Sequence, residues 1–376
     1  MEGPVFYSER LELLKDLEAL TQTELAEALG VRQSFISQIV NQTRPFPDGL
    51  AARASSVFKY PLTFFSVPPT VFDTAVATFR KKSAASARAE RQVVQSVREA
   101  SRAWNYTSKA SGFREFPGAL RAKHFAAPED AAFHARKISG LPADAPIRNM
   151  TQFAENLGVG VVLNLMGPQK TPGHLGASIP MRENSRPLIA LTGPTEGGRT
   201  RLTVAHELGH LLFDADLRVP IRGTRSPEEN RAFDFAGALL VPEKVMRERI
   251  DEHTTMRGFL EVKADYGISV AALIVRAERL AIISADRARS LHIQLSSLGW
   301  KKSEPIRIKV EKPSLFAQAA ARVWGSRSLA FKMSQTLGIP AKATDRWLGD
   351  SEPEGPQDEQ GAISKVVSLD ERKRKW

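Results

Sequence analysis

One short segment, residues 204 to 212 with the sequence VAHELGHLL, places the strongest constraint on the fold. His206 and His210 are four residues apart, so on a helix they lie on one face, where both imidazoles can bind a single zinc ion. The flanking residues are small and apolar, as a buried helix requires. We therefore expect a buried helix over 199–212, with Glu207 as the general base that takes a proton from metal-bound water.

A hydrolytic zinc site also needs a third protein ligand. The chain has 7 histidines and no cysteine, which excludes thiolate ligands, disulfides and a cysteine nucleophile. Residues 229–242 read ENRAFDFAGALLVP, and this pattern predicts a helix over 228–240 with Glu229 on its apolar face. A carboxylate on an inward face is costly unless it is paired or bound to a metal, so Glu229 is the best candidate. The competing carboxylates, which fit the inward face less well, are Glu228, Asp234 and Glu243.

The two segments together resemble the ImmA/IrrE metallopeptidases. The resemblance covers roughly residues 127 to 300 and rests on RTRLTVAHELGH at 199–210, on E-x-x-A-x-x-F-A-x-x-L-L-x-P at 229–242, and on YGISVAAL at 266–273. That family includes anti-repressor proteases of phages and mobile elements, and a radiation-response protease that cleaves a transcriptional repressor. The resemblance implies a zincin-like (gluzincin) site with Zn²⁺ as cofactor and Glu229 as third ligand. Leu202 stands where the family more often has Phe, which changes packing only.

Residues 8 to 66 resemble a helix-turn-helix of the XRE/Cro-C1 phage-repressor type. Thr21 and Glu24 form a capping box at the start of one helix, and Gly30 supplies the positive-φ turn that follows it. The next helix is expected over 33–40, with Phe35, Ile36 and Ile39 inward. Its outward polar side chains suit base edges and phosphates of double-stranded DNA, and the expected contacts are Gln33, Ser34, Ser37, Gln38, Asn41 and Arg44. The alternative is a helical docking domain that does not touch DNA.

The remaining pattern predicts an α+β protein, in which an all-α helix-turn-helix domain precedes a zincin-like domain with a small sheet. Candidate strands lie at 159–165, 177–179 and 187–191. The last of these either pairs with an extended substrate or is an ordinary core strand. The expected division is a helix-turn-helix domain over 5–68, a helical linker over 69–126, a zincin-like domain over 127–285, a C-terminal helical region over 286–350, and a disordered tail over 351–376.

Charge and composition bear on partners. The net charge of +11 and the pI of about 9.9 favour a polyanionic partner such as DNA. No apolar run approaches the ~20 residues that span a bilayer, and the N-terminus lacks the apolar core of a secretory signal, so we expect a cytoplasmic protein without a membrane partner. Helix-turn-helix domains often act as dimers that read two half-sites, which makes a homodimer one expectation. Arg199 and Arg201 either orient the metal helix, bind acidic substrate, or form solvated ion pairs.

Three functions follow from these patterns. The first is a DNA-associated zinc endopeptidase that regulates transcription by cleaving a repressor or antitoxin protein, for example in a stress or phage response. The second is a helix-turn-helix transcriptional regulator whose zincin-like domain is a sensor or a structural module. The third is a protein-interaction module such as an antitoxin.

Overall fold

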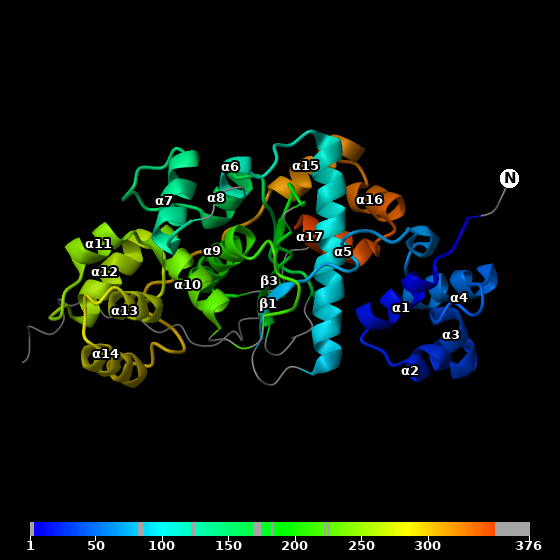
Figure 1. The fold of residues 1–376 in the computed structure, drawn as a ribbon, viewed down its shortest axis with the longest axis horizontal. Helices are drawn as coiled ribbons and strands as arrows, with labels where there is room; N and C mark the ends of the chain where they lie inside the picture. Colours follow the sequence, from blue (N-terminus) through cyan, green and yellow to red (C-terminus); the bar gives the residue numbers. More distant parts are fainter. Residues whose placement is uncertain are drawn as a thin grey trace, which may run out of the picture.

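The computed structural model describes residues 4–81, 86–121, 125–167, 174–181, 183–193, 195–221, 223 and 226–349. The expected disordered tail, 351–376, lies outside these residues. Figure 1 shows an elongated molecule with the N-terminal helices at one end and the helices of residues 243–297 at the other, and an α+β body between them. Among the described residues, no helix is long and apolar enough to cross a membrane.

Five short elements form the N-terminal domain: α1 (Ser8–Leu17), α2 (Gln22–Ala28), α3 (Gln33–Val40), α4 (Asp48–Phe58) and the 3₁₀ helix η1 (Leu62–Ser66). The capping box is present, because the Thr21 side chain accepts from the Glu24 backbone and the Glu24 carboxylate accepts from the Thr21 backbone. Gly30 has a φ of +61°, as the turn between α2 and α3 requires. These helices enclose a core of their own, which includes Leu11, Leu25 and Ile36.

The helical expectation for residues 69–126 needs correction. This segment contains strand β1 (Thr78–Lys81) before the long helix α5 (Ala87–Ser111) and the short helix α6 (Gly118–Arg121). Strand β1 pairs antiparallel with β3 (His174–Ser178), so the segment contributes an edge of the central sheet. Sequence patterns do not reveal this strand because it is only 4 residues long, and pairing with residues about 100 positions downstream leaves no local periodicity.

The sheet has the order β1-β3-β4-β2, with β2 at Gly160–Val162 and β4 at Leu188–Leu191. β4 runs antiparallel to β3 and parallel to β2. Both edges of β4 are therefore paired, and of the two alternatives for 187–191 the ordinary core strand is the correct one. Successive side chains of β4 point to opposite faces of the sheet and so belong to two different hydrophobic cores. Leu188 and Ala190 pack on the α5 side, whereas Ile189 and Leu191 pack on the opposite side.

On the α5 side, the sheet meets α5 and the C-terminal helices α15 (Leu315–Trp324), α16 (Leu329–Leu337) and α17 (Ala341–Leu348). Trp104 of α5 is fully buried against Gly160 of β2, where a Cβ would come within 2.7 Å of the indole. The C-terminal region thus shares a core with the expected linker, and Figure 1 shows both beside the sheet.

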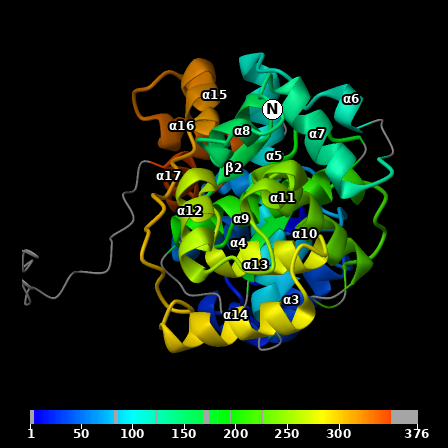
Figure 2. The same cartoon turned by 90° about the vertical axis from the view of Figure 1, so that its left-hand side faces the viewer.

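The opposite face of the sheet carries the helices that hold the candidate site. Here α9 (Gly197–Phe213) packs on β3 and β4, and α10 (Pro227–Leu240) packs across α9. Figure 2 shows the surrounding helices from that end of the molecule. They are α7 (Pro128–Ile138), α8 (Met150–Asn156), α11 (Glu243–Arg249), α12 (Met256–Tyr266), α13 (Val270–Arg279) and α14 (Ala285–Ser297).

Candidate metal centre

Helix α9 places His206, Glu207 and His210 in the protein interior, where each is at most 2 % exposed. Two glycines let the neighbouring elements approach this closely. A Cβ on Gly209 would lie 3.1 Å from the backbone of Ala232 on α10, and a Cβ on Gly176 of β3 would lie 2.7 Å from the Glu207 carboxylate. The small residues therefore bring α10 and β3 against the two faces of the helix that carries the histidines.

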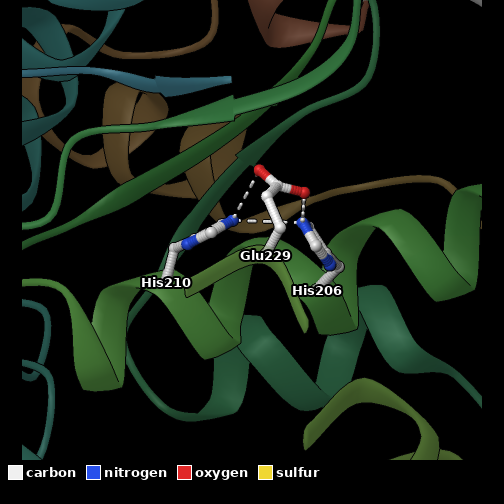
Figure 3. Close-up of side chains that lie close together, drawn as sticks. All are labelled: His206, His210 and Glu229. Atoms are coloured by element: carbon white, nitrogen blue, oxygen red, sulfur yellow. Dashed lines mark hydrogen bonds and ion pairs between the residues drawn. The ribbon is translucent and has the colours of Figure 1, made fainter. Parts of the chain in front are cut away.

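The side chain of Glu229 reaches the two histidines from the first turn of α10, where Ser226 caps the helix and Pro227 begins it. The Nε2 atoms of His206 and His210 are 3.1 Å apart, and they lie 3.4 and 3.5 Å from the two carboxylate oxygens of Glu229 (Figure 3). Among the described residues this is the group of three whose ligand atoms all lie within 4.8 Å of one another.

These separations can be compared with a tetrahedral zinc site. Ligands bound at ~2.0–2.1 Å with tetrahedral angles lie ~3.3–3.4 Å from one another. The observed 3.1, 3.4 and 3.5 Å match this spacing, and Oε2 of Glu229 is buried without accepting a hydrogen bond from any described residue. The donor set of two imidazoles and one carboxylate therefore fits a zinc ion in both chemistry and geometry.

Electrostatics within the cluster follow from burial and from the close packing of ionisable groups. Burial opposes charge on Glu229, but the two adjacent imidazoles outweigh it and lower the pKa of Glu229 to about 2. Burial also opposes charge on His210, whereas Asp214 and Glu229 raise the pKa of His210 to about 10. At neutral pH a metal ion would displace this proton, which makes metal affinity depend on pH.

The Glu207 carboxylate lies against strand β3 of the sheet. Burial raises its pKa to about 7, and the hydrogen bond from Ser178 acts in the opposite direction. Ser178 Oγ donates to Glu207 Oε2 at 2.8 Å, and Thr78 of β1 lies 2.8 Å from the same hydroxyl. The other oxygen, Oε1, is buried and accepts no hydrogen bond from the described residues, so it is available to a proton on a bound reactant.

Asp214 is a functional candidate that sequence reasoning missed. Its Oδ2 lies 2.6 Å from Nδ1 of His210, and its Oδ1 accepts from Arg231 on α10. Holding Nδ1 fixes the ring and points Nε2 at Glu229, which is the role that carboxylates commonly have behind metal-bound histidines. The acidic residue four positions after His210 was a signal available in the sequence, since that spacing places both side chains on one helical face.

The competing carboxylates lie elsewhere. Glu228 is half-buried and does not join the cluster, Asp234 pairs with Arg279, and Glu243 pairs with Arg247. Arg201 is buried in an ion pair with Glu311, so it supports the start of α9 and does not face a substrate. Arg199 is exposed.

In the N-terminal domain, α3 presents its polar face outward. Of the expected DNA contacts, Gln33, Ser34, Gln38, Asn41 and Arg44 are exposed, and Ser37 is half-buried. Four of these side chains, Gln33, Ser37, Asn41 and Arg44, already have partners in the structure. Gln33 donates to Gln22 at 2.8 Å, Asn41 donates to Ser37 at 3.3 Å, and the Arg44 guanidinium lies 4.5 Å from the centre of the Phe35 ring.

Comparison with known protein families identifies both regions. Residues 154–278 match the family model described as the IrrE N-terminal-like domain, and residues 12–65 match the model described as helix-turn-helix. No curated protein and no solved structure matches the chain. The two family matches confirm the resemblance and the order of the domains.

Proposed function

We propose that this chain, which joins a helix-turn-helix domain to an IrrE-type peptidase domain, is a DNA-associated zinc endopeptidase that regulates transcription by cleaving a repressor or antitoxin protein. The observation that carries the proposal is the convergence of His206, His210 and Glu229 from two helices, with Glu207 beside them. When bound, the zinc ion would supply a Lewis acid that polarises the scissile carbonyl and its attacking water.

Each of the chain's own residues has a definite part in this scheme. His206, His210 and Glu229 hold the ion, and Asp214 keeps His210 oriented through Nδ1. Glu207 accepts the proton of the attacking water and passes it to the leaving amine. Its raised pKa of about 7 suits this work, because a group that both takes and gives a proton is most effective near the operating pH. Ser178 holds one carboxylate oxygen so that the other faces the reaction.

For the N-terminal domain we propose binding to double-stranded DNA through Gln33, Ser34, Ser37, Gln38, Asn41 and Arg44. The exposed polar face of α3 supports this assignment, because amide side chains can pair with base edges in the major groove. Binding to DNA would place the peptidase in the cytoplasm, next to a regulator on the same DNA. A homodimer is part of the proposal, since two copies would read two half-sites.

The decisive experiment combines metal analysis with cleavage of a proteome-derived peptide library. We expect the purified chain to hold one equivalent of zinc and to cleave, His206→Ala to lose both, and Glu207→Gln to keep zinc but not cleave. Two matched controls are available: His253→Ala removes an exposed histidine, and Glu228→Gln removes the half-buried chain neighbour of Glu229. Full cleavage by Glu207→Gln would rule out the assigned mechanism.

DNA binding is tested by selecting duplexes with the full chain and measuring gel shifts. The double variant Gln33→Ala/Gln38→Ala should bind the selected duplex at least about tenfold more weakly, because each lost base contact is worth ~1–3 kcal/mol. Gln318→Ala, an exposed glutamine on α15, serves as control. Normal DNA binding and normal regulation by Glu207→Gln, with no cleaved protein, would instead support the alternative of a regulator with a sensor or structural zincin-like domain.

A further inference from the structure

Beside the metal centre lies a cavity of about 480 Å³ enclosed by α9, α10, α13, α14 and the chain that follows α14. It is called the basic pocket here. Leu202, Thr203 and Phe233 line it, and the same three residues line the small space of about 10 Å³ that touches His206 and Glu207. That small space has room for about one water molecule, whereas the basic pocket is in the range of ligand-binding pockets. The two cavities are thus neighbours across a shared wall.

Four of the charged side chains that line the basic pocket are neutralised by ion pairs. Arg276 pairs with Glu129 at 3.0 Å, Arg279 pairs with Asp234, and Glu304 pairs with Lys263. These pairs contribute little net potential inside the pocket.

A second set of lining charges is not neutralised in this way. Arg199, Lys301 and Lys302 are exposed and have no ion-pair partner among the described residues, and the one remaining carboxylate of the lining is Glu196. The pocket therefore carries an excess of two positive charges. Unpaired cations around a concave site attract anionic groups and orient them as they approach.

The lining also has apolar side chains. Ile268, Ala271, Val275, Leu295 and Trp300 contribute to it, and the side chains of Val275 and Trp300 are partly exposed. An occupant that satisfies the whole surface needs apolar groups to cover these side chains and carboxylates to meet the cations.

We propose that the basic pocket binds the stretch of a protein substrate next to the scissile bond, and that it selects stretches combining acidic and apolar side chains. This inference rests on the proposed peptidase function. It commits to a peptide occupant because the pocket shares Leu202, Thr203 and Phe233 with the small space at Glu207, so a peptide segment bound in the pocket would lie next to the reacting carbonyl. Lys301, Lys302 and Arg199 are then specificity-determining residues.

The test measures binding separately from cleavage. Two fluorescein-labelled hexapeptides, one alternating Leu with Glu and one alternating Leu with Lys, are titrated by fluorescence anisotropy into the full-length zinc-loaded Glu207→Gln protein, which should not hydrolyse them. We expect the acidic probe to bind at least about tenfold more tightly than the basic probe. Adding Lys301→Glu/Lys302→Glu should remove or invert this preference.

A matched control reverses two other charges in the same stretch of chain. Lys309 and Lys312 are exposed and do not line the pocket, so Lys309→Glu/Lys312→Glu should leave the preference unchanged. Equal binding of both probes, or the same loss in the control, would overturn the inference.

The peptide library adds a second readout with active enzyme. Cut sites should be enriched in Asp and Glu within a few residues of the cleaved bond, and Lys301→Glu/Lys302→Glu should abolish that enrichment. Cleavage without any acidic enrichment would contradict the pocket assignment while leaving the peptidase intact. Absence of metal-dependent cleavage alongside preferential binding of the acidic probe would contradict the peptidase function instead.

Discussion

This protein has two buried clusters of ionisable side chains that are similar in composition. They differ in how many of their carboxylate oxygens accept a hydrogen bond. The first joins the N-terminal domain to the body, where Arg10 of α1 and Arg102 of α5 flank Glu99. The second is the cluster of His206, His210, Glu229 and Glu207 between α9, α10 and the sheet. Each cluster places carboxylates beside cationic or basic groups away from water.

In the Glu99 cluster every carboxylate oxygen is matched. Arg10 donates to both oxygens at 3.1 and 3.0 Å, and Arg102 donates to both at 3.1 and 2.8 Å. Remaining donors reach Phe64 O and Leu337 O, so the network also holds η1 and α16. Although burial opposes its charge, the two guanidiniums hold the pKa of Glu99 far below its usual range. The network is complete, and its role is structural.

In the cluster of His206, His210, Glu229 and Glu207, the carboxylates are matched only in part. Oε1 of Glu207 and Oε2 of Glu229 are buried and accept no hydrogen bond from the described residues, and burial raises the pKa of Glu207 to about 7. Such an arrangement is unfavourable without a further positive charge. This contrast supports the proposal that the second cluster has a catalytic role, whereas the fully paired Glu99 cluster has a structural one.

The largest loss of stability is expected when the fully paired Glu99 cluster is broken. Glu99→Gln leaves two buried guanidiniums without a counter-charge and should lower the free energy of unfolding by about 3–5 kcal/mol, as measured in urea. Glu207→Gln, which removes a partly paired carboxylate from the metal-free protein, should cost far less or stabilise it. Glu12→Gln on exposed α1 surface is the control. A similar loss of unfolding free energy in Glu99→Gln and Glu207→Gln would contradict the distinction between a fully paired and a partly paired cluster.

The same contrast has a pH signature. Because the folded-state pKa of Glu99 is lowered from 4.5, its stabilising contribution is complete above that ordinary value and is lost as pH falls below it. The stability difference between wild type and Glu99→Gln should therefore be constant near neutral pH and shrink steadily below about pH 4.5. Urea titrations at a series of pH values measure it. A difference that does not change with acid would contradict the assigned pairing.

A smaller effect is expected one contact away from the ligands. Asp214→Asn keeps the size of the side chain but weakens its hold on His210 Nδ1, so zinc affinity should fall about 10–100-fold in a chelator competition. Asp251→Asn, an exposed aspartate on another segment, should leave affinity unchanged. Unaltered zinc affinity in Asp214→Asn would mean that Asp214 does not orient His210 for metal binding and has only a structural role.

The smallest change in stability is expected for an exposed ion pair in the same interface as the Glu99 cluster. Arg88 of α5 pairs with Glu24 of α2 at 3.3 Å, with side chains 42 % and 44 % exposed. Solvent screens this pair, so Arg88→Ala should change the free energy of unfolding by at most ~0.5 kcal/mol. Thermal or urea unfolding of Arg88→Ala and of Glu99→Gln, measured side by side, compares the stability loss from the two pairs of one interface. A loss comparable with that of Glu99→Gln would show that exposure does not separate the two pairs.

Local sequence patterns were sufficient to predict the two helices that carry the candidate site. The expected helices at 199–212 and 228–240 correspond to α9 at Gly197–Phe213 and α10 at Pro227–Leu240, and the capping box at Thr21 is present. These elements are recognisable because helical periodicity and capping act over three or four residues. Strand β1 was not recognisable, because it is defined by pairing with β3 far along the chain.

By itself, the sequence determined the chemistry of the protein: which histidines share a helical face, which carboxylate lies on the apolar face of the next helix, and which two domains the chain joins. Only the tertiary structure decided that Asp214 supports His210, that Glu99 bridges the domains, and that a basic pocket lies beside the metal centre. The physical reason is distance along the chain. Periodicity reports neighbours within one helix, whereas pairing of buried charges and enclosure of a cavity depend on how separate elements pack.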